Sequence, residues 1–162
     1  MSENAANRDK PPVLNINTLP MDFVDGDSPF MTTLYLGMAG GSKRLYANID
    51  RVMPGSKSCK FHKHSKQEEF FLVLSGAGTL RIGDETRAIK AGDFFCKPAG
   101  EGIAHQFIND SKEVLEILDV GAPDAEDVIE YPDEDVVYEK GAKRISKNGI
   151  PLKDWTSDPN AN

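Results

Sequence analysis

The chain has 162 residues, enough for one domain with a hydrophobic core and too few for two comfortable ones. Its apolar fraction of 39% is ordinary for a globular protein, and no stretch approaches the roughly 20 apolar residues that a membrane span needs. The net charge of −7 disfavours nonspecific binding to nucleic acid, because a phosphate backbone favours a basic surface. The polar N-terminus lacks the apolar core of a secretory signal, so we expect a cytoplasmic protein with no membrane or nucleic-acid partner.

In chain order, the sequence predicts a terminal arm followed by many short strands. The arm covers residues 1–30, is expected to be disordered from residue 1 to about residue 12, and includes a short strand at 13–21. Glycine-containing turns then separate runs with strand composition, which lie at 32–37, 43–55, 69–76, 78–82, 85–89, 93–97, 105–109 and 113–120. Many short strands without a long helical period predict an all-β sandwich or barrel.

After Gly121 the chain becomes acidic, then basic, and is interrupted by proline. Two runs there, 128–132 and 136–140, are either edge strands or an arm that packs on the barrel or on a partner subunit. Trp155 is a candidate anchor for the chain end. The predicted organisation is an N-terminal arm at 1–30, a barrel at 31–121 and a C-terminal extension at 122–162.

Charge is unevenly spread along the chain. Residues 110–139 contain twelve acidic side chains and one basic one, whereas residues 57–97 contain eight basic and five acidic ones. The simplest interpretation of both runs is a solvated surface. The basic run also favours an anionic small-molecule substrate, because its charge would attract one.

The two cysteines are too few for a disulfide framework, so we expect reduced thiols. Cys59 precedes His62 by three residues, which leaves open an accessory role near a metal ion. Cys96 is flanked by strand-like sequence and is expected to be a structural thiol.

The three histidines of the chain indicate a metal site. His62 and His64 are two residues apart, so on a strand their side chains face the same way, about 7 Å apart. Imidazoles at that spacing can bind one ion through bonds of about 2.1 Å. Glu69 opens the next strand and offers a carboxylate, while His105 has to arrive from a distant hairpin.

Two runs of the sequence resemble the conserved motifs of the cupin superfamily. Residues 55–76, GSKSCKFHKHSKQEEFFLVLSG, resemble the first motif, in which His-x-His is followed by four residues, Glu, six residues and Gly. Residues 92–109, GDFFCKPAGEGIAHQFIN, resemble the second motif, in which Gly, Pro-x-Gly, His and Asn follow in order. Two spacings depart from the motifs, since one extra residue precedes His62 and two extra residues precede His105.

The first motif also bears on which carboxylate belongs to the site. Glu68 competes with Glu69, and alternation does not decide between them because both faces of the strand are apolar. The motif spacing favours Glu69, with Gln67 as a weaker alternative.

The resemblance implies an all-β fold, the double-stranded β-helix or jelly-roll-like barrel of the cupins, flanked here by N- and C-terminal arms. It implies that one divalent ion, Mn, Fe, Ni, Co, Cu or Zn, is bound by His62, His64, Glu69 and His105. Three imidazoles and a carboxylate suit such an ion and leave positions open for water or substrate. The alternatives are a metal-free cupin that kept its histidines, or three unrelated surface histidines.

Further side chains are candidates for the cavity and the core. The polar residues that can line the cavity are Arg51, Arg81, Tyr46 and Gln106. The aromatic residues expected in the core are Phe61, Phe71, Phe94, Phe95 and Phe107. No residue is identified as catalytic, and no organic cofactor is expected.

The cupin superfamily includes isomerases, epimerases, dioxygenases, decarboxylases and simple binding modules, and the fold does not choose among them. The basic barrel favours a metal-dependent enzyme on a small anionic molecule, such as a sugar phosphate isomerase or epimerase. A metal-dependent dioxygenase and a non-catalytic module that binds a sugar are the alternatives. A homodimer whose arms at 13–38 and 122–150 cross between subunits is also expected, because an open sandwich leaves strand edges to be covered.

Overall fold

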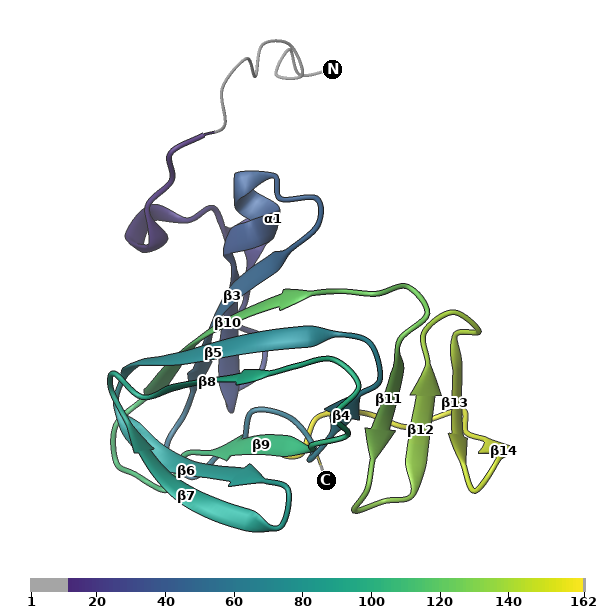
Figure 1. Ribbon diagram of the computed structural model, residues 1–162. Helices are drawn as coiled ribbons and strands as arrows, with labels where there is room; N and C mark the ends of the chain where they lie inside the picture. Colours follow the sequence, from purple (N-terminus) through teal and green to yellow (C-terminus); the bar gives the residue numbers. More distant parts are fainter. Residues whose placement is uncertain (1–11, 162) are drawn as a thin grey trace, which may run out of the picture.

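The computed structural model describes residues 12–161, and these residues are folded mainly into short strands (Figure 1). The disorder expected at the start of the chain falls on residues outside this range. The strands are β1 (Val24–Asp25), β2 (Met31–Tyr35), β3 (Tyr46–Val52), β4 (Lys63–His64), β5 (Glu68–Ser75), β6 (Ala77–Ile82), β7 (Glu85–Lys90), β8 (Phe94–Lys97), β9 (His105–Ile108), β10 (Leu115–Ala122), β11 (Val128–Tyr131), β12 (Val136–Glu139), β13 (Arg144–Lys147) and β14 (Ile150–Pro151). Helical structure is limited to α1 (Leu36–Gly40) and the 3-10 turns η1 (Ile16–Thr18) and η2 (Met21–Phe23). The all-β prediction is confirmed. Within the described residues, no helix is long and apolar enough to cross a membrane.

Two sheets enclose the main core. One sheet has the strand order β1-β2-β3-β10-β5-β8, and the other has the order β7-β6-β9, with antiparallel neighbours throughout. Buried apolar side chains from both sheets meet between them: Val52, Phe71, Val73, Leu80, Ile89, Phe107, Leu115 and Ile117. This packing makes the barrel a layered sandwich whose interior is apolar at one end.

Alternation along β5 decides which glutamate points inward. Glu69, Phe71 and Val73 are buried in alternate positions, whereas Glu68 is exposed on the outer face. The apolar core that holds Phe71 and Val73 therefore also directs the Glu69 side chain into the barrel.

Two residues of the cupin motifs have structural roles. Gly76 has a φ of +77°, and a Cβ there would collide with the backbone carbonyl of Val114. Asn109 is fully buried, and its side-chain amide donates to the carbonyl oxygens of Val52 and Glu113 at 2.7 and 2.8 Å. Gly76 thereby lets the end of β5 approach the backbone at Val114, and Asn109 connects the end of β3 to the segment before β10.

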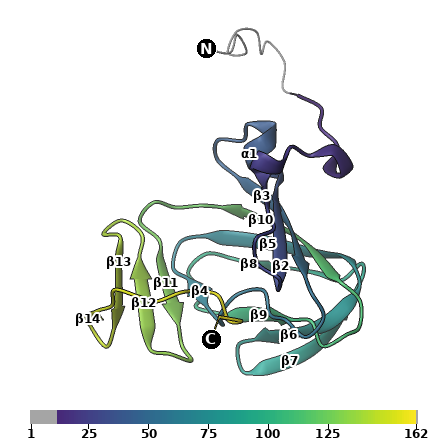
Figure 2. The same cartoon turned by 180° about the vertical axis from the view of Figure 1, so that it is seen from behind.

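A third sheet, with the order β14-β13-β12-β11-β4, stands beside the barrel at the end where β4 lies (Figures 1 and 2). It is attached through antiparallel pairing of Ile129 with His64. Tyr131 and Trp155 pack edge to face at 4.5 Å in its small core, and the Trp155 Nε1–H donates to Glu134 Oε2 at 2.5 Å. The C-terminal extension is therefore packed against its own barrel, with Trp155 as the anchor.

The acidic extension pairs with the basic part of the barrel. Three ion pairs connect them: Lys60–Glu134 at 2.7 Å, Lys63–Glu130 at 2.9 Å and Arg81–Asp133 at 2.5 Å. Each such partly exposed pair contributes only about 0–1 kcal/mol to stability. The pairing nevertheless shows that parts of two runs of opposite charge, separate in the sequence, lie against each other in space.

Three details of the sequence interpretation were wrong. The strand expected at 13–21 is replaced by η1 and η2, because the Asn15 side chain accepts a hydrogen bond from the Asn17 N–H and favours a turn. The strand expected at 32–37 ends at Tyr35, where the chain enters α1. Phe94 is 69% exposed instead of lying in the core, because the alternation of β8 turns Phe95 inward.

Candidate metal centre

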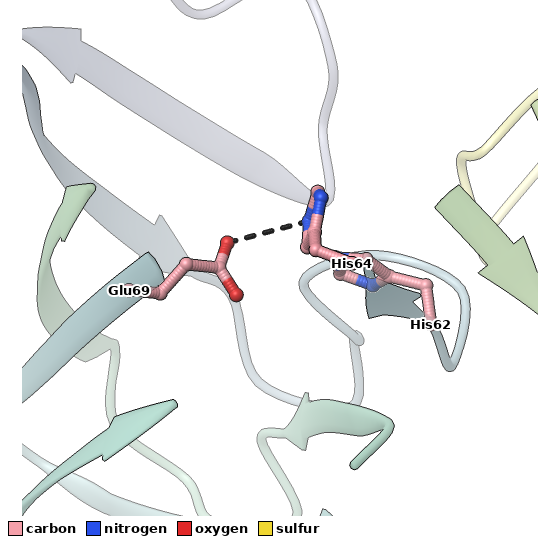
Figure 3. Close-up of side chains that lie close together, drawn as sticks. All are labelled: His62, His64 and Glu69. Carbon is pink, nitrogen blue, oxygen red and sulfur yellow. Dashed lines mark ion pairs between the residues drawn. The ribbon is translucent and has the colours of Figure 1, made fainter. Parts of the chain in front are cut away.

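Three of the four predicted ligands lie together at the end of the barrel next to β4 (Figure 3). One donor atom from each of His62, His64 and Glu69 lies within 4.8 Å of the other two. His64 is on β4 and Glu69 is the second residue of β5, so the short turn between these strands brings the two side chains face to face. His62 precedes β4 and is held by backbone hydrogen bonds to His105, at 3.2 and 2.8 Å.

The hydrogen bonds that Nδ1 makes in His62 and His64 place the lone pair of each ring on Nε2. Nδ1 of His62 lies 2.9 Å from the carbonyl oxygen of Lys60, and Nδ1 of His64 lies 2.6 Å from Oδ2 of Asp127. Both oxygens accept, so these bonds assign the hydrogen to Nδ1 and a lone pair to Nε2 in each neutral ring. A carboxylate or carbonyl behind the ring is the usual partner of a metal-binding histidine.

The contact between His64 and Glu69 fits a bound cation. Nε2 of His64 lies 3.4 Å from Oε1 of Glu69. The side-chain amide of the buried Gln67 lies 3.5 Å from this nitrogen and donates to this oxygen at 3.0 Å, so Gln67 belongs to the cluster as a hydrogen-bond donor. Two ligands that each lie about 2.1 Å from a tetrahedral ion are about 3.4 Å apart. Burial lowers the pKa of His64, and burial with the charges of His64 and Lys97 lowers that of His62 to about 4, so a proton is disfavoured. The donor set of His62, His64 and Glu69 therefore suits a divalent ion.

Asp127 connects the C-terminal sheet to this cluster, and the sequence interpretation missed it. It is fully buried, and its Oδ1 accepts from the backbone N–H groups of Ser65 and Lys66 at 3.0 and 2.8 Å. Burial opposes its ionisation, but His64, these N–H groups and Lys140 hold its pKa far below the usual range. The charged carboxylate thus orients His64 and the turn that leads to β5. Because Asp127 lies within a run of acidic residues, nothing in the sequence distinguished it from its neighbours.

His105 lies beside the cluster but outside the group of mutually close donor atoms. Its ring centroid is 4.7 Å from that of His62. Its Nδ1 lies 2.7 Å from Nζ of Lys97, which also lies 2.8 Å from Oε2 of Glu69. Burial, together with the charges of His62 and Lys97, lowers the pKa of His105 well below its usual range. The sequence interpretation did not single out Lys97, although alternation places it on the same face as Phe95.

A cavity of about 290 Å³ adjoins the cluster and has a polar wall that includes Tyr46, Asn48, Asp50 and Asp119. The Tyr46 hydroxyl lies 3.0 Å from Oδ1 of Asp119 and 3.1 Å from Oε1 of Glu69, so it can donate to either. Burial, reinforced by the charges of Asp50 and Glu69, raises the pKa of Asp119 to about 8. Burial and Asp119 also raise the pKa of Tyr46. The cavity therefore presents groups that hold protons near neutral pH.

The other polar residues suggested for the cavity lie elsewhere. Arg51 is paired with Glu116 at 2.7 Å. Arg81 and Gln106 line a separate cavity, where the Arg81 guanidinium stacks over the Phe61 ring. Of the four suggested residues, Tyr46 alone lines the cavity beside the cluster.

The two cysteines differ in position. Cys59 lies with its Sγ 3.3 Å from Nδ1 of His62, and burial raises the pKa of its thiol to about 12. The thiol is therefore protonated and packs behind the His62 ring. Cys96 is exposed.

Known proteins share both the sequence pattern and the architecture. The cupin domain family matches residues 48–121. The crystal structure of a cupin-superfamily sugar phosphate isomerase from Silicibacter pomeroyi superposes with a TM-score of 0.72, at 27% identity, over 86% of this chain and 98% of that one. A protein named as a candidate sugar phosphate isomerase from Acidithiobacillus ferrooxidans gives a TM-score of 0.65, at 30% identity, over 75% of this chain and 74% of that one. Among curated proteins, none is significantly similar in sequence.

The chain belongs to the cupin superfamily, as its two motifs indicated. The fold is also shared with a predicted oxalate decarboxylase from Thermotoga maritima, which has a TM-score of 0.58 at 23% identity over 68% of this chain and 98% of that one. The cupin barrel thus recurs in proteins with different named activities, so the activity has to be argued from the site.

Proposed function

We propose that this protein is a metal-dependent isomerase or epimerase of a small sugar phosphate, with the ion held by His62, His64 and Glu69. The observation that carries the proposal is the set of two Nε2 lone pairs and one carboxylate beside a cavity lined by proton-holding groups. The proteins from Silicibacter pomeroyi and Acidithiobacillus ferrooxidans, at 27% and 30% identity, support the substrate class by their names.

The chemistry requires polarisation of a carbonyl group and movement of a proton on the neighbouring carbon. A divalent ion at this site would supply the polarisation. Asp119, with a pKa of about 8, and Tyr46 face the same cavity and are the groups we assign to hold the moving proton. Asn48 and Asp50 can accept hydrogen bonds from sugar hydroxyls along the adjoining wall.

Solvent exchange tests this function directly. Metal-loaded protein is incubated in D₂O with a panel of aldose and ketose phosphates and with the corresponding unphosphorylated sugars, and the products are followed by proton NMR. We expect loss of the signal from the hydrogen next to the carbonyl, together with a new sugar, and none of this in the His62→Ala/His64→Ala control. Absence of exchange across the whole panel with a metal-loaded protein would contradict the proposal.

A metal-dependent dioxygenase is the second candidate, and the geometry of the cluster favours it specifically. Two histidines and one carboxylate form the donor set of the non-haem Fe(II) oxygenases, which leaves positions open for substrate and O₂. Elemental analysis of untagged protein separates the two candidates. Iron, nickel or copper would direct the work to O₂ uptake, whereas zinc or manganese would support the isomerase, and protein that binds no ion would point to a sugar-binding module.

We also propose that the protein is a homodimer that uses the N-terminal segment. Exposed apolar side chains gather there, at Val13, Leu14, Ile16, Met21 and Met38. Residues 122–150 pack on their own barrel, so residues 13–38 are the better candidate for contact between subunits. Light scattering is expected to report a dimer, and a stable monomer at micromolar concentration would refute this arrangement.

A further inference from the structure

An ammonium group lies inside the candidate metal centre. Lys97 is on β8 and is paired directly with Glu69 in the antiparallel ladder with β5. It is 6% exposed, and its Nζ lies 2.8 Å from Oε2 of Glu69 and 2.7 Å from Nδ1 of His105. Glu69 and His105 are both members of the four-residue ligand set that the cupin motifs imply. Lys97 therefore engages one atom of each.

The hydrogen bond from Lys97 determines where the His105 ring carries its hydrogen. An ammonium group can only donate, so Nδ1 of His105 accepts, and Nε2 carries the hydrogen in the neutral ring. Neither nitrogen of His105 then has a free lone pair for a metal ion. His62 and His64 are arranged in the opposite way, because their Nδ1 atoms donate to oxygens and their Nε2 atoms carry the lone pairs.

The charge of Lys97 also opposes a divalent ion. An ion held by His62, His64 and Glu69 would lie beside this buried ammonium, where repulsion between like charges is stronger than in water. Glu69 would in addition have to divide its single negative charge between the ion at Oε1 and the buried ammonium at Oε2, which weakens the ion pair with Lys97.

We propose that Lys97 is a positioning residue that keeps His105 out of the ligand set and lowers the affinity of the site for a divalent ion. His105 becomes a ligand when the Lys97 side chain moves away from Glu69 and His105. This inference rests on the proposed metal binding by His62, His64 and Glu69.

The variant Lys97→Met tests the proposal, because methionine keeps an unbranched apolar side chain and removes the charge and the donor hydrogens. Affinity for Zn²⁺ is measured on the metal-free full chain by competition with a chromophoric chelator. We expect Lys97→Met to bind at least about tenfold more tightly than the wild type. Lys97→Arg, which keeps the charge, should stay near the wild type. Lys90→Met is the matched control, because its side chain is 78% exposed and its loss changes the net charge equally.

The nitrogen chemical shifts of the histidine rings provide a second readout that needs no metal ion. The metal-free wild type is expected to show His105 with its hydrogen on Nε2, and Lys97→Met should shift this tautomer toward Nδ1. A wild-type His105 with its hydrogen on Nδ1 would overturn the proposal, as would equal or weaker Zn²⁺ binding by a folded Lys97→Met variant. If that variant does not fold, Lys97→Gln replaces it in both measurements.

These outcomes separate the inference from the proposed function. Wild-type protein that binds Zn²⁺, with no gain in Lys97→Met, would leave the metal-dependent function standing and overturn the role of Lys97. Failure of both proteins to bind any divalent ion would overturn the proposed function and this inference together.

Discussion

The two sides of the candidate metal centre are built from different regions of the chain, and the histidines on the two sides form different hydrogen bonds through Nδ1. On the side of the C-terminal sheet, His62 and His64 donate through Nδ1, and Asp127 from the extension fixes the second ring. On the barrel side, His105 accepts a hydrogen bond from Lys97 through the corresponding atom. A motif position thus identifies which histidine approaches the site, while the partner behind the ring determines whether it can bind an ion.

The largest effect on metal binding is expected from the removal of His62 and His64. His62→Ala with His64→Ala should abolish stoichiometric metal binding, because it removes both Nε2 lone pairs. The barrel should still fold, since neither residue belongs to the main core, although it loses the stabilisation that a bound ion confers. Elemental analysis and chelator titration measure the loss.

His105→Ala is the matched comparison in the same titration. We expect a change of less than about tenfold in affinity, because the His105 ring has no free lone pair while Lys97 is bound to it. Loss of the ion as complete as in the double variant would show that the two sides of the site are equivalent.

A smaller effect is expected from the carboxylate that the C-terminal sheet supplies. Asp127→Asn should weaken metal binding by about 10- to 100-fold, because it replaces the charged acceptor of the His64 Nδ1–H with a neutral amide, which holds the required tautomer less firmly. It should also lower the free energy of unfolding by about 3 kcal/mol, since Lys140 and His64 lose a buried partner. Calorimetric titration and denaturant unfolding measure the two effects.

Asp133→Asn is the control for Asp127→Asn in the same region of the chain. Asp133 pairs with Arg81, and its side chain is 51% exposed, away from the cluster. Its loss should leave the affinity for metal unchanged. A similar loss of affinity in both variants would mean that the extension acts through its overall charge, without a specific contact.

The smallest effect concerns the pH dependence of stability in metal-free protein. The folded pKa of Asp119 is raised to about 8 by burial and by the nearby Asp50 and Glu69. Its unfolded value is about 3.9, so the folded state binds more protons between these values, and this group makes stability fall as pH rises from about 4 to 8. Asp119→Asn removes this contribution, and its melting temperature relative to the wild type should increase across that range. A difference independent of pH would contradict the assignment.

The barrel and most of the cluster could be predicted from the sequence because their signals are local. Strand alternation and turn residues indicated the all-β architecture. The placement of Glu69 near His62 and His64 depends on one short turn between two consecutive strands. It can therefore be predicted without knowledge of contacts between distant parts of the chain. The choice of Glu69 over Glu68 followed from the motif, and the inward direction of its side chain follows from the apolar face of β5.

Tertiary structure alone decided the contacts made between residues far apart in the chain. Asp127 reaches His64 where β11 pairs with β4, and Lys97 lies opposite Glu69 where β8 pairs with β5; no local period encodes either pairing. The same long-range packing brings three acidic residues of the extension onto basic residues of the barrel. The sequence by itself determined which side chains can offer a lone pair to a metal ion and which strands carry those side chains. The folded arrangement determined which of those lone pairs are free, because that depends on the hydrogen-bond donors and charges packed behind each ring.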